Sequence, residues 1–352
     1  MASSAGAVSE RGFVLAVTLW LLAAIAVAVA ALTLWALSEV ADAALERERT
    51  DDELAIFSTR ESLLYLASTR ALTRAGLPVE RMGEEERALR MLDEMGGLRR
   101  DPRGGELALD GTPYHGLGGI RFAIQDEAGL FSVAWPSDAS IDRFLAARGV
   151  RSRRIPQLRD ALLDYIDADD LRRLNGAERR EYERERLPPP PNRRLLLPRE
   201  LFSVMGWSQL EEGETIHEDE LTAFYLGAVN LNTAPASLLP LWLQDCPRTC
   251  EAFLERRAVT PYRSGAEVEA IHGIQLPGDE AISYRFLADE ILRLTFWGNS
   301  GAAWRMHVRL TPLANGRGPW TVLATYPVPR PSDDAIQDPG SDLLADLPQR
   351  ER

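Results

Sequence analysis

The sequence predicts an α+β protein in which one long amino-terminal helix packs on a small antiparallel sheet, and a large all-helical domain is inserted into that sheet. Three observations predict this class. An apolar run near the amino terminus continues without proline to about residue 75. Apolar and polar residues alternate around residues 120–124 and again across residues 292–326. Between these two stretches, apolar residues recur at helical spacing, so the helical part interrupts the sheet.

The first element is a membrane-spanning helix. Phe13 to Ser38 is a run of 26 residues without an ionisable side chain. Such a helix is about 39 Å long, which exceeds the hydrocarbon core of a bilayer. Two alternatives stay open, a plain membrane anchor and a secretory signal cleaved near Ala41-Asp42-Ala43, although the apolar region of such signals has only about 7 to 15 residues.

The membrane helix is predicted to continue as one rod to about Ala75, because no proline occurs before Pro78. Helical spacing predicts one buried face on this rod. Its members are Leu54, Phe57, Leu64, Ala67 and Ala71.

The sheet is predicted from four alternating segments. Ile120, Phe122 and Ile124 indicate a first, half-buried strand, whereas residues 81–119 predict no firm element. Three more strands are predicted within residues 292–296, 304–310 and 320–326, and short Gly-rich turns at residues 298–301 and 315–318 join them. Such short connections predict an antiparallel meander.

The composition excludes some partners. The net charge of −13 opposes binding to a polyanion, so nucleic acid is not an expected partner. The two cysteines, Cys246 and Cys250, are too few for a disulfide scaffold or a closed zinc site. A disulfide and two separate thiols both remain open for them.

No arrangement of residues predicts catalysis. The four histidines are scattered, and neither a second His at metalloprotease spacing nor a Gly-x-Ser-x-Gly elbow occurs. We therefore expect no enzymatic activity, with a membrane-anchored hydrolase as the rival from another class.

Four motifs, in order along the chain, carry a family resemblance. Arg11 to Trp20 looks like a type IV prepilin signal, with Gly12 and Phe13 before the apolar helix. Gln125 to Gly129, Asp160 to Asp170 and Val229 to Pro235 resemble the further motifs of one family. The chain thus resembles the minor pseudopilins of the type II secretion system known as general secretion pathway protein K.

The resemblance implies a pilin-like fold with defined boundaries. These are a leader at residues 1–12, a transmembrane helix at 13–38, a pilin-like helix and first strand at 39–136, an inserted helical domain at 137–285, sheet-completing strands at 286–328 and a disordered tail at 329–352. It also implies that a prepilin peptidase cuts after Gly12 and that the new amine of Phe13 is methylated. Most pilins have Glu at the fifth position of the mature chain, whereas this chain has Val17 there. The K-type members likewise lack this Glu.

The same resemblance implies the partners and the location. The chain is expected to span the inner membrane once, with its large domain in the periplasm, and to meet the inner-membrane secretion platform. It would join minor pseudopilins of the I and J types at the pseudopilus tip and help to start assembly for protein export. The alternative is a minor pilin of a type IV pilus or competence system that binds DNA.

A carboxylate cluster in the insertion predicts a calcium site. The candidate ligands are Asp164, Asp167, Asp169, Asp170 and Glu178. Hard carboxylate oxygens suit calcium, but Leu171 and Arg172 break the EF-hand pattern. The resemblance adds calcium as a structural ion, and a solvated acidic helix end stays the alternative.

The insertion also predicts helix-hairpin-helix units. One comprises the segment after Asn230 together with residues 262–273, and Glu200 to Gly206 echoes it. Asn232 and Thr233 are predicted to cap a helix, because such side chains satisfy free amides at helix starts.

Overall fold

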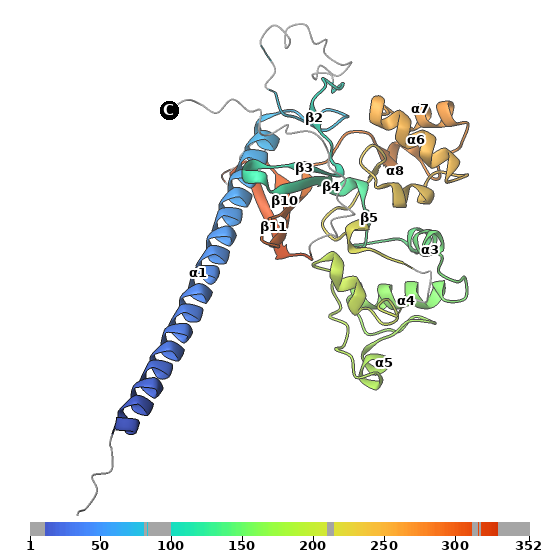
Figure 1. Ribbon diagram of the computed structural model, residues 1–352. Helices are drawn as coiled ribbons and strands as arrows, with labels where there is room; N and C mark the ends of the chain where they lie inside the picture. The colour runs from blue at the N-terminus through green and yellow to red at the C-terminus, as the bar shows by residue number, and fades with distance from the viewer. Residues whose placement is uncertain are drawn as a thin grey trace, which may run out of the picture.

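The computed structural model describes residues 11–80, 83, 100–209, 215–311, 316 and 318–329. Figure 1 shows a long helix that leans against a sheet, with two helical lobes on the side of the sheet away from the helix. Most of the predicted leader and almost all of the predicted tail lie outside the described residues.

The amino-terminal rod is a single helix, α1, from Arg11 to Thr69. Its 59 residues span about 89 Å. The helix contains an apolar stretch that is long enough to cross a membrane and is not buried within the protein (Figure 1). The predicted continuation beyond the membrane segment is confirmed, although the helix ends six residues earlier than expected.

The predicted buried face of α1 is right only in part, because Leu64 is buried and Ala67 packs against the same core, whereas Ala71 is exposed. Leu54 and Phe57 are exposed, and the face that packs on the sheet contains Leu63, Leu66 and the polar Thr59. The Thr59 hydroxyl accepts a hydrogen bond from the backbone N–H of Leu117 at 3.0 Å. Because polar side chains with specific partners also lie on the packed face, hydrophobicity alone identified that face only in part.

The sheet has five antiparallel strands in the order β11-β10-β9-β4-β3. The predicted meander is confirmed as β9 (Ile291–Trp297), β10 (Ala303–Leu310) and β11 (Trp320–Pro327). The first predicted strand is β4 (Arg121–Asp126), and it pairs directly with β9. The insertion therefore leaves the sheet after β4 and returns in the neighbouring strand, β9.

Two features of the sheet differ from the prediction. Strand β3 (Asp110–His115) lies in the segment where no element was expected, since Gly111 and Pro113 disguise its alternation. Strand β4 is not half-buried, because Ala123 and Gln125 on its second face are also buried. The insertion covers that face, so alternation along the strand does not correspond to exposure.

The first lobe of the insertion contains three α-helices, α3 (Asp138–Ala147), α4 (Ile155–Ile166) and α5 (Arg179–Arg184). They enclose a core that includes the fully buried Trp207 and Phe144. The second lobe packs α6 (Arg248–Val259) and α7 (Gly265–His272) around a core that includes Phe253 and Tyr262.

The insertion is mainly, but not wholly, helical. Its extended segments pair as β5 (Phe131–Ser132) with β6 (Leu221–Thr222) and as β7 (Val229–Asn230) with β8 (Tyr284–Arg285). Buried backbone groups in such segments need partners, and short parallel pairing supplies them. The other short elements are β1 (Leu77–Pro78), β2 (Glu106–Leu107), α8 (Glu280–Ser283), and the 3₁₀ turns η1 (Leu117–Gly119), η2 (Glu127–Gly129), η3 (Pro198–Ser203), η4 (Glu218–Glu220) and η5 (Ala236–Leu241).

Candidate functional site

Two of the sequence motifs meet where the sheet joins the insertion. Asp126, at the end of β4, is completely buried. One carboxylate oxygen accepts hydrogen bonds from Asn230 Nδ2 at 2.8 Å and Thr233 Oγ1 at 2.9 Å. The other accepts from the backbone N–H groups of Ala128 at 3.1 Å and Asp289 at 3.2 Å. Residues far apart in sequence thus share one carboxyl group, which we call the junction carboxylate.

Close backbone approach completes the junction. The Gln125 side-chain amide donates to the Thr233 carbonyl at 2.9 Å. A Cβ atom on Gly129 would lie 2.5 Å from that same carbonyl oxygen, so only glycine fits there. The two motifs therefore act as matching halves of one contact.

Burial raises the pKa of Asp126 to about 6, and its hydrogen bonds with Asn230, Ala128 and Thr233 oppose the rise. The net effect is that this carboxyl takes up a proton at a higher pH than an exposed aspartate does.

Asn232 and Thr233 do not cap a helix, contrary to the prediction. Asn232 Oδ1 accepts from the Tyr262 N–H at 3.0 Å, and its Nδ2 donates to the carbonyls of Tyr262 at 2.8 Å and Phe286 at 3.0 Å. These contacts supply hydrogen-bond partners to backbone groups of loops in the second lobe that are not paired in a sheet. The sequence could indicate that these side chains form hydrogen bonds with backbone groups, but it could not indicate which residues supply those groups.

A buried Glu-His pair lies beside the junction and was not predicted. His307 Nδ1 lies 2.6 Å from Glu127 Oε1, and its Nε2 lies 2.9 Å from the Tyr326 hydroxyl. Burial lowers the pKa of His307 although Glu127 opposes this. Both side chains are fully enclosed, so no substrate reaches them, and the pair is structural. Along β10, His307 alternates with the apolar Met306 and Val308, so the sequence pattern did not indicate that His307 is buried.

The structure distributes the predicted metal ligands among several partners. Asp164 and Asp167 contact the Arg173 guanidinium at 3.0 and 2.5 Å. Asp169 accepts the Leu171 N–H at 2.8 Å, and Asp170 accepts from Asn192 Nδ2 at 3.0 Å. Across the described residues, no three acidic, His or Cys side chains form a group able to hold a metal ion.

Glu178 differs from the other predicted ligands. It is 5% exposed, and neither carboxylate oxygen has a hydrogen-bond partner. Burial, followed by the negative charges of Asp164 and Asp167, raises the pKa of Glu178 to about 7. A buried carboxylate without a partner among like charges is expensive to ionise unless a cation joins it. Of the five predicted ligands, Glu178 is thus the one whose carboxylate charge has no partner within the described residues.

The second lobe contains the predicted helical hairpin. Helices α6 and α7 are joined by residues 260–264, and Cys246, just before α6, forms a disulfide with Cys250 in the first turn of α6. The echo at Glu200 to Gly206 instead forms the 3₁₀ turn η3 and a following turn.

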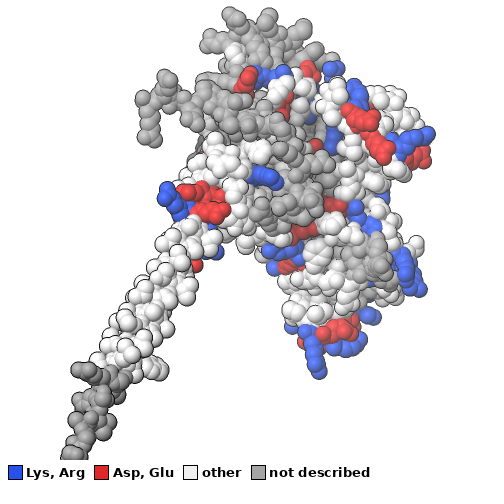
Figure 2. Space-filling model, viewed as in Figure 1, with Lys and Arg blue, Asp and Glu red and all other residues white. Residues whose placement is uncertain are grey.

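The hairpin is engaged with the protein itself. Arg257 of α6 donates to the carbonyls of Leu231 at 3.1 Å and Ala234 at 2.7 Å. Burial lowers the pKa of this guanidinium, which faces the junction rather than solvent. Figure 2 shows basic and acidic side chains interspersed on the visible face of the head, so no continuous basic surface extends across that face.

Comparisons with known proteins give two findings. Residues 132–211 match a family model described as type II secretion system (T2SS), protein K. The chain is also similar to a chain in the crystal structure of the GspK-GspI-GspJ complex from the type 2 secretion system of enterotoxigenic Escherichia coli. That similarity covers 81% of this chain and 99% of the other, at 13% sequence identity and a TM-score of 0.46. No curated protein sequence matches the chain.

We predict that Asp126→Asn flattens the pH dependence of stability. Because folding raises the pKa of Asp126 from 3.8 to about 6, its stabilising contribution is complete below about pH 4 and is lost as the pH rises through 6. The free energy of unfolding of the wild type should fall, relative to the variant, by up to about 3 kcal/mol between these limits. Urea unfolding of the full chain in detergent at pH 4 and pH 7 measures this difference.

The exposed Glu255 of α6 supplies the matched control, since Glu255→Gln removes one carboxylate without touching the junction. Equal pH dependence in the wild type and Asp126→Asn would contradict the prediction.

Proposed function

We propose that this chain is a minor pseudopilin of the type II secretion system that starts pseudopilus assembly from the tip, and the match of residues 132–211 to the protein K family model supports this. The observation that supports this role is the combination of a free apolar rod with a bulky head. The insertion spans residues 127–290 and lies beside the sheet, away from the rod (Figure 1). A head of this size is easier to place at the end of a fibre than within its closely packed shaft.

The exposed face of α1 supports association with partner helices. Leu54, Phe57 and Tyr65 are 60%, 53% and 60% exposed and lie on one side of the helix. They are opposite the face that packs on the sheet, and the apolar membrane segment precedes them in the same rod. An exposed apolar stripe of this kind suits helix-to-helix packing. By family resemblance the partners are the I-type and J-type minor pseudopilins, and the work is structural, not enzymatic.

The location follows from the same rod. A single apolar helix long enough to cross a bilayer precedes the head, which is consistent with an inner-membrane anchor and a periplasmic domain. The disulfide between Cys246 and Cys250 fits an oxidising compartment. Contact with the secretion platform belongs to the same proposal.

DNA binding, the alternative function, is not favoured. The arginine of the hairpin closest to the junction is occupied by backbone carbonyls. The chain is acidic overall, and phosphate binding requires a local surplus of basic side chains.

Calcium is proposed as a structural ion held by Glu178 with Asp169 and Asp170. These carboxylates would supply oxygen ligands, while Arg173 already neutralises much of the charge of Asp164 and Asp167. The ion would compensate the buried charge of Glu178 and stabilise the segment between α4 and α5.

Processing gives the direct test of the pseudopilin pathway. We expect the protein isolated from cells with a prepilin peptidase to begin at a methylated Phe13. Amino-terminal sequencing and intact mass measure this. Gly12→Val should retain the twelve-residue leader, because by family resemblance the peptidase requires glycine before the cut. A wild-type chain that begins at Met1 or near Ala44 would contradict the proposal.

We predict that charge on the exposed face of α1 disrupts assembly. The double variant Leu54→Glu/Phe57→Glu should reduce co-purification with the I-type and J-type pseudopilins by about tenfold or more, because it places carboxylates in an apolar helix interface. Quantitative pull-down from detergent-solubilised membranes measures the loss.

The matched control adds the same charges to exposed positions of the insertion, as Ser152→Glu/Gln157→Glu. Co-purification of the α1 variant at the level of this control would rule out the exposed face as the contact.

We predict that calcium binding depends on Glu178 and releases protons near neutral pH. A bound cation favours the ionised carboxylate, whereas burial and its acidic neighbours raise the pKa of Glu178 to about 7. Titration calorimetry of the full chain in two buffers of different ionisation enthalpy measures both quantities.

Glu178→Gln should weaken binding by about tenfold or more and remove most of the proton release. Glu183→Gln, at an exposed position of α5, should change neither. The absence of calcium-dependent heat together with an unchanged melting temperature would exclude the site.

A further inference from the structure

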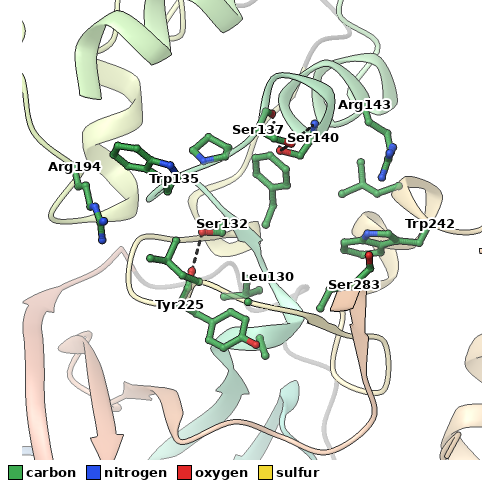
Figure 3. A pocket seen from close by; sticks show the side chains of 17 residues that line it. Leu130, Ser132, Trp135, Ser137, Ser140, Arg143, Arg194, Tyr225, Trp242 and Ser283 are labelled. Carbon is green, nitrogen blue, oxygen red and sulfur yellow. Dashed lines mark hydrogen bonds between the residues drawn. The ribbon is translucent and has the colours of Figure 1, made fainter. Parts of the chain in front are cut away.

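A groove of about 510 Å³ opens between the two lobes of the insertion. Its lining includes the apolar side chains of Leu130 and Leu241. The aromatic rings of Trp135, Tyr225 and Trp242 also line it (Figure 3). This volume lies in the range of sites that hold small ligands or a few residues of a peptide.

The groove carries positive charge in an acidic protein. Arg143 of α3 and Arg194 of the first lobe line opposite sides of the hollow (Figure 3). Neither guanidinium has an ion-pair partner within the part of the chain that the structure describes. None of the 17 described residues that line the groove is acidic, although the chain has a net charge of −13.

Two large apolar side chains of the groove are exposed to solvent. Trp135 is 59% exposed and Leu226 is 49% exposed. The Arg194 guanidinium lies 5.0 Å from the centre of the Trp135 ring, so cation and ring form one exposed unit. Exposed tryptophan with arginine is typical of the residues that dominate protein interfaces.

The frame of the groove is preformed. Ser132 Oγ donates to the Tyr225 carbonyl at 2.7 Å, drawn as a dashed line in Figure 3. Phe131 stacks on Phe144 with ring centres 4.1 Å apart, and this contact ties the groove to the core of the first lobe. A fixed frame reduces the conformational entropy that a ligand must overcome on binding.

We propose that this groove binds an extended, acidic segment of another protein. An apolar or aromatic side chain of that segment occupies the space between Trp135 and Trp242, and carboxylates on either side of it pair with Arg143 and Arg194. Charge complementarity selects this occupant, because the groove combines apolar walls with two free cations and no acidic group. The proposal does not depend on the secretion role of the chain, since it concerns direct binding to the groove.

The test uses the full chain in detergent micelles and a fluorescein-labelled peptide, Asp-Asp-Phe-Asp-Asp, with fluorescence anisotropy as the readout. Micelles without protein give the background. We expect saturable binding that weakens with added salt, and binding about tenfold weaker for the peptide with Asn in place of Asp.

The variants separate the two parts of the groove. Arg143→Glu/Arg194→Glu and Trp135→Ala should each weaken binding by about tenfold or more, because they remove the charge partners and the aromatic wall. These three side chains are exposed, so their replacement leaves the core intact. Matched controls at other exposed positions are Arg153→Glu/Arg309→Glu and Trp304→Ala, which should bind as the wild type does.

Two results would overturn the proposal. The absence of saturable binding at millimolar peptide concentration would exclude an acidic segment as the occupant of the groove. Equal affinity for the wild type and Trp135→Ala would show that the arginines attract the peptide over the surface, without the groove.

Discussion

The fold depends on one buried carboxyl group at the point where the sheet becomes the insertion. Asp126 receives hydrogen bonds from Asn230 and Thr233 at the entry to the second lobe and from Asp289 at the return to the sheet. These three donors are more than 100 residues away along the chain. A buried polar group tolerates few alternative arrangements, because each lost partner leaves an unsatisfied charge or dipole. The junction carboxylate therefore fixes where the insertion leaves and rejoins the sheet.

This constraint has a mechanical consequence. Strands β4 and β9 are neighbours, so both ends of the insertion are connected to adjacent strands of the same sheet. The sheet in turn packs on the carboxyl-terminal part of α1 through residues such as Leu63 and Leu66. Force or orientation imposed on the membrane helix is thus carried to both lobes through a short path.

Sequence predicted the parts of the fold that repeat a simple period. The apolar rod and the strands of the meander follow spacings of 3.6 and 2, and they were located well. The packed face of α1 was predicted only in part because Thr59 and Asp52 lie on it, and their roles depend on a loop and a turn that are distant in sequence. The prediction for Asn232 was wrong for the same reason, since its side-chain amide donates to the backbone carbonyls of residues 262 and 286. Periodicity reports hydrophobic contact, whereas these positions are decided by hydrogen bonds across the fold.

The same distinction separates the two acidic motifs, which look alike as sequences. Burial raises the pKa of both Asp126 and Glu178. Asp126 has four hydrogen-bond donors around its two oxygens, so its site is complete without any further ligand. Within the described residues the Glu178 carboxylate has no such donor, and the negative charges of Asp164 and Asp167 add to the effect of burial on its pKa. A carboxylate whose partners are all supplied by the chain serves the fold, whereas one that is buried without partners is where the proposed cation would compensate charge. The number of donors, more than the number of acidic residues, therefore identifies which motif is a candidate for calcium.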